Sequence, residues 1–268
     1  MSSASRNLAW AVILSACGVC GALAVGKTLE GRRDTVAPSR AIAEVPILMY
    51  HRVDAMPTDA TTMYRRMTVS PDELREHARW LRNEGFNTIT FAQLDEYFRG
   101  DFTLPSNPII LSFDDAFDEH YFVVAPILKR FSLGGTFFVH TDWVGKFNCL
   151  TWEQVGHLAE AGFEIGSHTR THPVLPSLSD AALWDELRQS RATLAKRLGA
   201  APGVVAYPFG ESDERVQSTA RAAGYSLAAG TRDGAFQRAS ERFNLRRIEI
   251  RSGDTVPTLK RLISGEPR

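Results

Sequence analysis

The stretch Pro108-Ile109-Ile110-Leu111-Ser112-Phe113-Asp114-Asp115 joins a short apolar run to two adjacent carboxylates. An apolar run of this length predicts a buried strand. Acidic side chains at the end of a buried strand are costly unless a partner compensates them. In open α/β sheets and barrels, functional side chains gather at the carboxyl ends of the strands. This stretch therefore predicts a parallel α/β fold with chemistry at Asp114 and Asp115.

A second polar motif, His168-Thr169-Arg170-Thr171-His172, follows the apolar stretch 163–166 and precedes Pro173. Neutral imidazole is a common ligand of zinc-like ions, so two histidines at a strand end suggest a metal site. The spacing alone is weak, and a surface loop with two incidental histidines is the alternative. With the two motifs together, one carboxylate completes the ligand set and the other accepts a proton from water. For Asp115, capping of the following helix is the competing interpretation.

The rest of the chain alternates apolar segments with amphipathic ones. This alternation predicts a parallel β/α architecture, specifically a barrel. A chain of 268 residues without internal repeats suits one large domain of this kind. The expected strands are 45–50, 86–90, 109–113, 135–140, 163–167, 204–207, 225–228 and 245–250. The expected helices are 70–85, 91–98, 116–130 (with Pro126 as a kink or break), 151–161, 179–198, 216–223 and 256–263.

Charge and cysteine content narrow the class of protein. Lys plus Arg and Asp plus Glu both number 31, which gives a net charge of zero. No basic stripe is present, so we expect no nucleic-acid partner. Of the 3 cysteines, only Cys149 lies beyond the N-terminal segment, which excludes a disulfide within the domain and a cysteine-based zinc pattern.

The N-terminus carries an uncharged apolar segment, residues 8–25, between Arg6 and a basic stretch that begins at Lys27. Three interpretations compete: a bilayer anchor, a signal peptide cleaved at Ala22-Leu23-Ala24, and a lipobox with Cys17 as the lipidated residue. Each predicts export to the periplasm or the cell exterior, with a bacterial membrane as a partner. A buried N-terminal helix is the alternative. The expected organisation is a signal peptide or anchor over 1–26, a linker over 27–44 and one domain over 45–268.

Three motifs resemble those of the polysaccharide deacetylases, the carbohydrate esterase family 4 enzymes with a NodB homology domain. The motifs are Ser112–Asp115, His168–His172 and Tyr207-Pro208-Phe209-Gly210, in the family's order. The resemblance spans about residues 45–250. It implies a distorted (β/α)7 barrel that removes N-acetyl groups from a polysaccharide with one divalent metal ion. Zn²⁺ suits two histidines and one aspartate, as do Co²⁺, Ni²⁺ and Fe²⁺.

The resemblance also implies roles for single residues. Asp114 corresponds to the catalytic base, and the backbone N–H of Phe209 to a donor that stabilises the oxyanion. Trp152 and Tyr207 are expected to contact substrate, although Trp152 at a helix start could instead belong to the core. The metal ligands implied by the motifs are Asp115, His168 and His172.

The chain departs from the common family pattern in two places. No histidine follows His172, so the usual late Leu-x-His motif is absent, and Ala206 stands where an arginine is usual. Both departures resemble the subgroup that acts on poly-β-1,6-N-acetylglucosamine, in which a histidine near the start of the domain is the acid. His51 matches that histidine. Arg247 resembles the subgroup's late arginine, which implies that it orients Asp114.

Several alternatives remain open at this level. His51 could be a structural histidine, and Arg247 could form only a surface salt bridge. The substrate could be peptidoglycan or chitin in place of a poly-N-acetylglucosamine. A non-catalytic polysaccharide-binding protein on the same barrel is the competing class of function.

Overall fold

The computed structural model of this chain describes residues 40–268. The predicted signal or anchor over 1–26, and most of the predicted linker over 27–44, lie outside the described residues. Within residues 40–268, no helix is both long and apolar enough to cross a bilayer.

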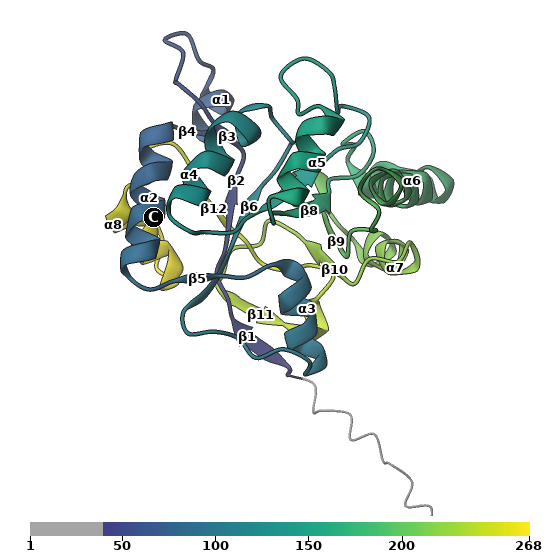
Figure 1. The fold of residues 1–268 in the computed structure, drawn as a ribbon. Helices are drawn as coiled ribbons and strands as arrows, with labels where there is room; N and C mark the ends of the chain where they lie inside the picture. The colour runs from purple at the N-terminus through teal and green to yellow at the C-terminus, as the bar shows by residue number, and fades with distance from the viewer. Residues whose placement is uncertain (1–39) are drawn as a thin grey trace, which may run out of the picture. The chain divides into compact units, whose positions relative to one another are not determined.

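The central sheet has eight parallel strands among the described residues, and seven of them follow one another in a single order (Figure 1). Their order is β10 (Leu227–Ala229), β9 (Val204–Ala206), β8 (Glu164–Ser167), β7 (Thr136–Val139), β6 (Pro108–Phe113), β2 (Ile47–Tyr50) and β12 (Ile248–Glu249). The short strand β5 (Asn87–Thr88) also pairs with β6. The two edges of the sheet approach each other, because Ala229 at the end of β10 bridges Leu245, just before β12. The sheet therefore curls into the distorted (β/α)7 barrel that the sequence predicts.

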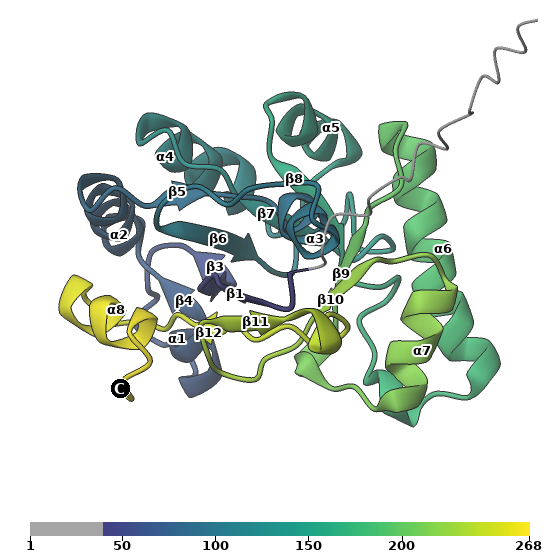
Figure 2. The ribbon, with the colours of Figure 1, turned by 90° about the horizontal axis from the view of Figure 1, so that it is seen from below.

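Helices surround the strands, as Figure 2 shows. They are α2 (Pro71–Asn83), α4 (Ala125–Arg130), α5 (Trp152–Glu160), α6 (Asp180–Leu198), α7 (Glu214–Ala222) and α8 (Val256–Ile263). The helix α3 (Phe91–Arg99) closes the lower end of the barrel in Figure 1, where Phe91 and Phe98 are buried. The start of α2 has the expected capping box, since Ser70 Oγ accepts from Glu73 N–H at 3.1 Å and the Glu73 carboxylate accepts from Ser70 N–H.

The barrel core follows the two-residue period of its strands. Along β6, Ile109, Leu111 and Phe113 pack against the outer helices, whereas Ile110 belongs to the inner cluster with residues of α3. Because alternate side chains share a face, Asp114 continues the inner face that begins at Ile110. The sheet therefore carries this carboxylate to the mouth of the barrel.

Short or irregular elements are where the structure departs from the prediction. A π-helical turn over His120–Val124 and then α4 replace the single helix expected over 116–130. Ala116 has a left-handed φ of 51°, and Pro126 lacks the N–H that a continuous helix needs. The strand expected over 245–250 is regular only in β12. The elements that the periodicity did not reveal are β1 (Ile42–Glu44), β3 (Arg52–Val53), α1 (Thr62–Met67), β4 (Thr68–Val69), β11 (Phe236–Arg238) and the 3₁₀ turns Leu175–Ser177, Pro208–Gly210 and Ala239–Glu241.

Candidate active site

The barrel mouth brings together the three side chains that the sequence proposes as metal ligands. Asp115 follows β6, while His168 and His172 lie in the loop after β8. Oδ1 of Asp115 lies 3.4 Å from Nε2 of His168 and 3.4 Å from Nε2 of His172. Among the described residues, these three form a cluster with one ligand atom each within 4.8 Å of the others.

The spacing within this cluster fits a metal ion better than it fits direct hydrogen bonds. Two ligand atoms bound to a tetrahedral zinc ion at its usual bond length lie about 3.3 Å apart. A separation of 3.4 Å matches that geometry and exceeds the range of a good N–H···O hydrogen bond. One carboxylate and two imidazoles also leave a fourth position for water or substrate. The donor set therefore fits a divalent ion of the zinc type.

Contacts outside the cluster orient its imidazoles. Nδ1 of His168 lies 2.8 Å from the carbonyl oxygen of Ala206, so an Nδ1–H donor leaves the Nε2 lone pair toward Asp115. Burial and the neighbouring His168 lower the pKa of His172 to about 4, so its imidazole is neutral at neutral pH. His172 is therefore in the neutral form that binds a cation. Burial acts to lower the pKa of His168, but the Asp115 and Asp114 carboxylates outweigh it and raise that pKa, so a cation bound at Nε2 would take the place of a proton.

The histidine loop is fixed by a carboxylate that sequence reasoning missed. Glu186 of α6 is buried and accepts hydrogen bonds from the N–H groups of Arg170 and Thr171 at 2.9 and 2.8 Å. It also accepts from Oγ1 of Thr171 at 2.7 Å. A Glu in the middle of an amphipathic helix reads as a solvent-facing residue, so only tertiary structure reveals this role.

Strained backbone is concentrated at the same place. Asp115, Thr169, His172 and Phe209 have left-handed φ values of 74°, 64°, 66° and 58°. Each non-glycine residue in this region costs on the order of 1–3 kcal/mol unless its surroundings enforce the conformation. Such strain is typical of sites where side-chain or amide direction matters more than stability.

Arg247 and Asp114 form a buried, bidentate ion pair inside the barrel mouth. Nη1 and Nη2 of Arg247 lie 2.8 and 2.9 Å from Oδ1 and Oδ2 of Asp114. Nε of the same guanidinium donates to the carbonyl oxygen of Gly230 at 2.8 Å. Arg247 is 1% exposed, so the surface salt bridge considered for it is not what the structure shows. The arginine instead fixes both oxygens of Asp114.

The charge state of Asp114 follows from this environment. Burial acts to raise its pKa, but the charges of Arg247 and His168 outweigh burial and leave the pKa below its ordinary value. Asp114 is therefore ionised at neutral pH. An ionised carboxylate at a fixed position can accept a proton from a water molecule beside the neighbouring cluster.

His51 follows β2 and lines a cavity of about 390 Å³ together with Arg247 and Phe209. Its carbonyl oxygen lies 2.7 Å from Nε2 of His120, which fixes the backbone at this point. Nδ1 of His51 is buried and has no hydrogen-bond partner among the described residues. His51 thus lines this cavity, and one of its ring nitrogens has no hydrogen-bond partner among the described residues.

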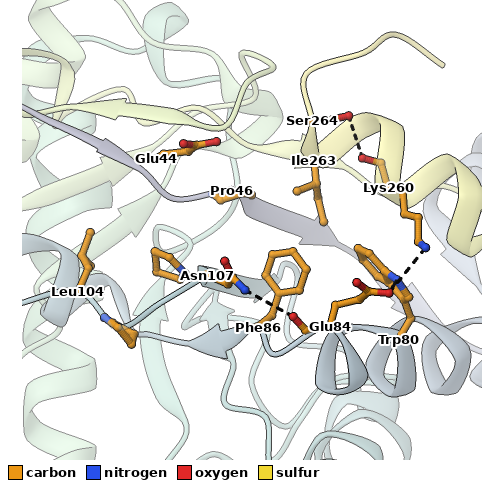
Figure 3. Close-up of a pocket in the computed structure, with 12 residues that line it drawn as sticks. Glu44, Pro46, Trp80, Glu84, Phe86, Leu104, Asn107, Lys260, Ile263 and Ser264 are labelled. Atoms are coloured by element: carbon orange, nitrogen blue, oxygen red, sulfur yellow. Dashed lines mark hydrogen bonds and ion pairs between the residues drawn. The ribbon is translucent and has the colours of Figure 1, made fainter.

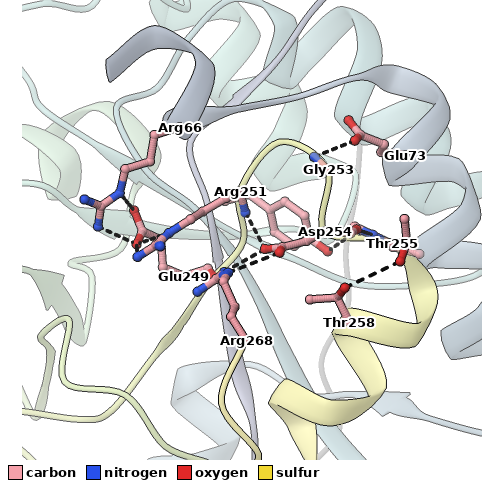
Figure 4. Close-up of polar contacts among 11 residues, drawn as sticks. Arg66, Glu73, Glu249, Arg251, Gly253, Asp254, Thr255, Thr258 and Arg268 are labelled. Carbon is pink, nitrogen blue, oxygen red and sulfur yellow. Dashed lines mark hydrogen bonds and ion pairs between the residues drawn. The ribbon is translucent and has the colours of Figure 1, made fainter. Parts of the chain in front are cut away.

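Part of the lining of this cavity is a network of ion pairs that the sequence did not predict (Figure 4). Glu249 accepts from Nε and Nη2 of Arg66 at 3.1 and 2.8 Å, and from Nε of Arg251 at 2.8 Å. Arg66 comes from α1 and Arg251 from the loop after β12, so the network joins two segments far apart in sequence. It gives the cavity a charged and polar part of its lining.

The three residues predicted to contact substrate lie in different environments. Phe209 is 61% exposed, and its ring meets His172 edge to face at 4.8 Å between centroids. Tyr207 is fully buried, and its hydroxyl donates to the carbonyl oxygen of Phe243. Trp152 packs on the outer core beneath the guanidinium of Arg197 and does not line the cavities at the cluster. Only Phe209 is brought to the site.

A second cavity at the cluster, of about 420 Å³, lies on the side of His172 and exposes residues that sequence reasoning left unassigned. Its lining residues are Arg52, Asp115, Phe117, His140, Trp143, Phe147, Asn148, Cys149, Thr171 and His172. Burial and the nearby His168 lower the pKa of His140 to about 4, so this imidazole is neutral as well. The position of His140 at the end of the expected strand 135–140 was the available signal.

A larger cavity, of about 680 Å³, lies at the opposite end of the barrel (Figure 3). Pro46 and Pro108 line it at the starts of β2 and β6, and Trp80 and Phe86 supply its aromatic walls. Catalytic groups of barrels gather at the carboxyl ends of strands, which makes the smaller cavities at the cluster the candidate active site.

A curled parallel barrel with this cluster at its mouth belongs to the class of barrel hydrolases. Comparison with known proteins gives the family. The polysaccharide deacetylase family model matches residues 102–228. The putative polysaccharide deacetylase YxkH of Bacillus subtilis is 26% identical over 211 residues, which are 79% of this chain and 73% of that protein.

Two further similar proteins are also deacetylases by name. The poly-beta-1,6-N-acetyl-D-glucosamine N-deacetylase of Escherichia coli is 31% identical over 138 residues, which are 46% of this chain and 20% of that protein. The structure of Streptococcus pyogenes deacetylase PplD in complex with acetate superposes with a TM-score of 0.78 at 26% identity, covering 84% of this chain and 99% of that chain. These comparisons identify a polysaccharide deacetylase domain within the chain, over residues 102–228, and they indicate a deacetylase hydrolase.

Proposed function

We propose that this protein is a metal-dependent N-deacetylase of a poly-N-acetylglucosamine-like polysaccharide. The observation that carries the proposal is the juxtaposition of two units: the Asp115–His168–His172 cluster and the Arg247-held carboxylate of Asp114. Hydrolysis of an acetamide needs an activated water molecule, a site for the oxyanion and an acid for the departing amine. The barrel mouth offers a residue for each of these needs.

Each residue has one task in the proposed mechanism. When bound at the cluster, a divalent ion such as Zn²⁺ supplies a Lewis acid that polarises the acetyl carbonyl and lowers the pKa of water. Asp114 accepts the proton of the attacking water, and Arg247 holds both carboxylate oxygens during the transfer. The Phe209 N–H donates a hydrogen bond to the developing oxyanion. His51 gives a proton to the leaving amine.

The polymer is inferred from the residue pattern together with a relative. The early His51 and the late Arg247 match the subgroup pattern, and the Escherichia coli relative is named for poly-beta-1,6-N-acetyl-D-glucosamine. The apolar segment 8–25 supports a further part of the proposal, that the domain is exported and stays near a bacterial membrane. Edman sequencing or mass analysis of the mature protein from cell fractions tests the export step.

Acetate release from defined oligosaccharides tests the activity. The zinc-loaded protein is incubated with β-1,6-linked N-acetylglucosamine oligomers, chitin oligomers and peptidoglycan fragments at equal acetamide concentration. We expect the highest kcat/KM on the β-1,6-linked oligomers. A higher value on chitin or peptidoglycan would reassign the substrate. Binding of oligomers without acetate release under any divalent ion would overturn the catalytic proposal.

A further inference from the structure

The loop over residues 141–150, between β7 and α5, forms one wall of the 420 Å³ cavity and is here called the aromatic loop. Trp143 is 45% exposed and Phe147 is 90% exposed. A single exposed apolar side chain is common, but two exposed aromatic rings that line one cavity form a patch of the kind that marks a binding site. The same cavity is bounded by Asp115 and His172 of the proposed metal cluster, so these rings lie next to the reacting centre.

Backbone hydrogen bonds tie the aromatic loop to both ligand-bearing segments. The N–H groups of Thr141 and Asp142 donate to the carbonyl oxygens of Thr169 and Arg170, at 3.2 and 2.9 Å. Two further bonds reach the segment after Asp115, from Leu150 N–H to the Ala116 carbonyl and from Asp118 N–H to the Asn148 carbonyl, at 2.9 and 3.1 Å. The position of the aromatic loop is therefore set by the same strands that place the cluster, which is what a preformed binding wall requires.

The base of this wall holds polar atoms without partners. His140 is 7% exposed, and its Nδ1 has no hydrogen-bond partner among the described residues. The adjacent Thr141 Oγ1 is also buried without a partner among them. Each such atom costs about 1–3 kcal/mol, and in native structures it usually indicates a ligand, a water molecule or a functional role. Of these two residues, His140 lines the cavity, so its unpaired nitrogen is the observation that indicates a polar ligand there.

Trp143 connects this polar base to the apolar part of the wall. The Trp143 ring meets His140 edge to face at 5.9 Å between centroids, and the backbone N–H of Trp143 donates to the His140 carbonyl oxygen at 3.1 Å. Sugars present apolar C–H faces and polar hydroxyl and acetamido edges, so one aromatic face beside one hydrogen-bonding group matches a single sugar unit.

We propose that the cavity between the aromatic loop and the Asp115–His172 pair is a saccharide subsite, with Trp143 as its apolar wall and His140 as its hydrogen-bonding anchor. The inference rests on the proposed function, because the bound sugar is the unit next to the one whose acetamido group reacts. The subsite makes the enzyme prefer polymer over monosaccharide. His140 and Trp143 act here as substrate-binding residues of the reaction, separate from the metal ligands.

Binding and turnover are measured separately so that the two proposals can fail independently. Asp114→Asn protein loaded with zinc binds substrate without converting it. Its affinity for β-1,6- and β-1,4-linked N-acetylglucosamine tetramers is measured by calorimetry with Trp143→Ala or with Trp184→Ala added. Trp184 lies on α6, is 38% exposed and is absent from the cavity, which makes it a matched control.

We expect Trp143→Ala to weaken tetramer binding about tenfold or more and Trp184→Ala to change it less than twofold. Equal effects of the two substitutions, or no tetramer binding to the parent protein, overturn the subsite. If binding depends on Trp143 while wild-type protein releases no acetate from either tetramer, the subsite stands and the proposed deacetylase activity fails.

His140 is tested by replacements that separate hydrogen bonding from shape. His140→Phe keeps a flat ring and removes the nitrogens, whereas His140→Gln keeps a hydrogen-bonding group. We expect His140→Phe to raise the KM for the tetramer by a larger factor than it lowers kcat, with the zinc content unchanged. His140→Gln recovers most of the KM. Loss of zinc, or a fall in kcat that Gln does not rescue, would make His140 structural and overturn its binding role.

Discussion

Replacing Arg247 by Met isolates the contribution of the buried ion pair in the barrel mouth. The substitution keeps an unbranched apolar stem and removes the guanidinium, with its two hydrogen bonds to Asp114 at 2.8 and 2.9 Å and its bond to the Gly230 carbonyl oxygen. Removing one partner of a buried pair leaves the other charge without compensation and costs about 3–5 kcal/mol. We expect Arg247→Met to lower the free energy of unfolding by that amount at pH 7, measured by urea titration.

Two control proteins sharpen this prediction. Arg66 also makes two hydrogen bonds to one carboxylate, that of Glu249, but its side chain is 52% exposed. Arg66→Met should therefore cost less than about 1 kcal/mol. In the double variant with Arg247→Met, Asp114→Asn removes the stranded charge and should recover part of the loss. A cost below 1 kcal/mol for Arg247→Met, or no recovery in the double variant, would refute this account.

The same pair predicts a pH dependence with a definite sign. The pKa of Asp114 is lowered in the folded protein, so its contribution to stability is present above its unfolded pKa of about 3.9. That contribution is lost as the pH falls through the folded value. The stability of the wild type, measured by urea titration, should hence be complete at neutral pH with respect to this pair and fall as the pH drops below about 4.

Three further predictions concern other parts of the barrel. Burial lowers the pKa of His120 to about 4, so stability falls by up to about 3 kcal/mol between about pH 6.5 and pH 4, and urea titrations of His120→Gln should show a flatter profile. A methyl group at Gly166 meets the Phe138 ring, so Gly166→Ala costs about 1–3 kcal/mol and lowers the Tm. Gly156 lies in α5 with open space around it, so Gly156→Ala should instead stabilise the protein by about 0.5–1 kcal/mol in thermal melts. Chelation of divalent ions lowers the Tm and stops acetate release in wild type but leaves the Tm of His168→Ala unchanged.

The parts of the fold that sequence predicts well are those with long, regular patterns. The Ser70–Glu73 capping box and the buried run 109–113 carry strong local signals, and both appear as expected. The two-residue strands and the π-helical turn before Pro126 are too short to show a repeating pattern. Pairing partners far along the chain decide these elements, so local sequence does not reveal them.

For the site, the sequence predicts which residue types meet but not what surrounds them. The Asp115, His168 and His172 cluster forms as the motifs imply, although the ligand roles stay predictions. The hydrogen bond from His168 to the Ala206 carbonyl does not depend on the side chain at 206, so the sequence does not reveal it. The sequence also does not reveal that Glu186 is buried and binds the histidine loop. A motif does not show whether its aromatic residue is buried or exposed. For this reason the sequence predicted a substrate contact for Tyr207, which lies in the core.

The central claim is that Asp114, held by Arg247 beside the Asp115 cluster, is the base of a metal-dependent N-deacetylation. Acetate release from a β-1,6-linked N-acetylglucosamine tetramer, compared between zinc-loaded wild type and Asp114→Asn with the same zinc content, tests it most directly. We predict a decrease in kcat of at least about 100-fold for Asp114→Asn. Equal rates in the two proteins would contradict the account.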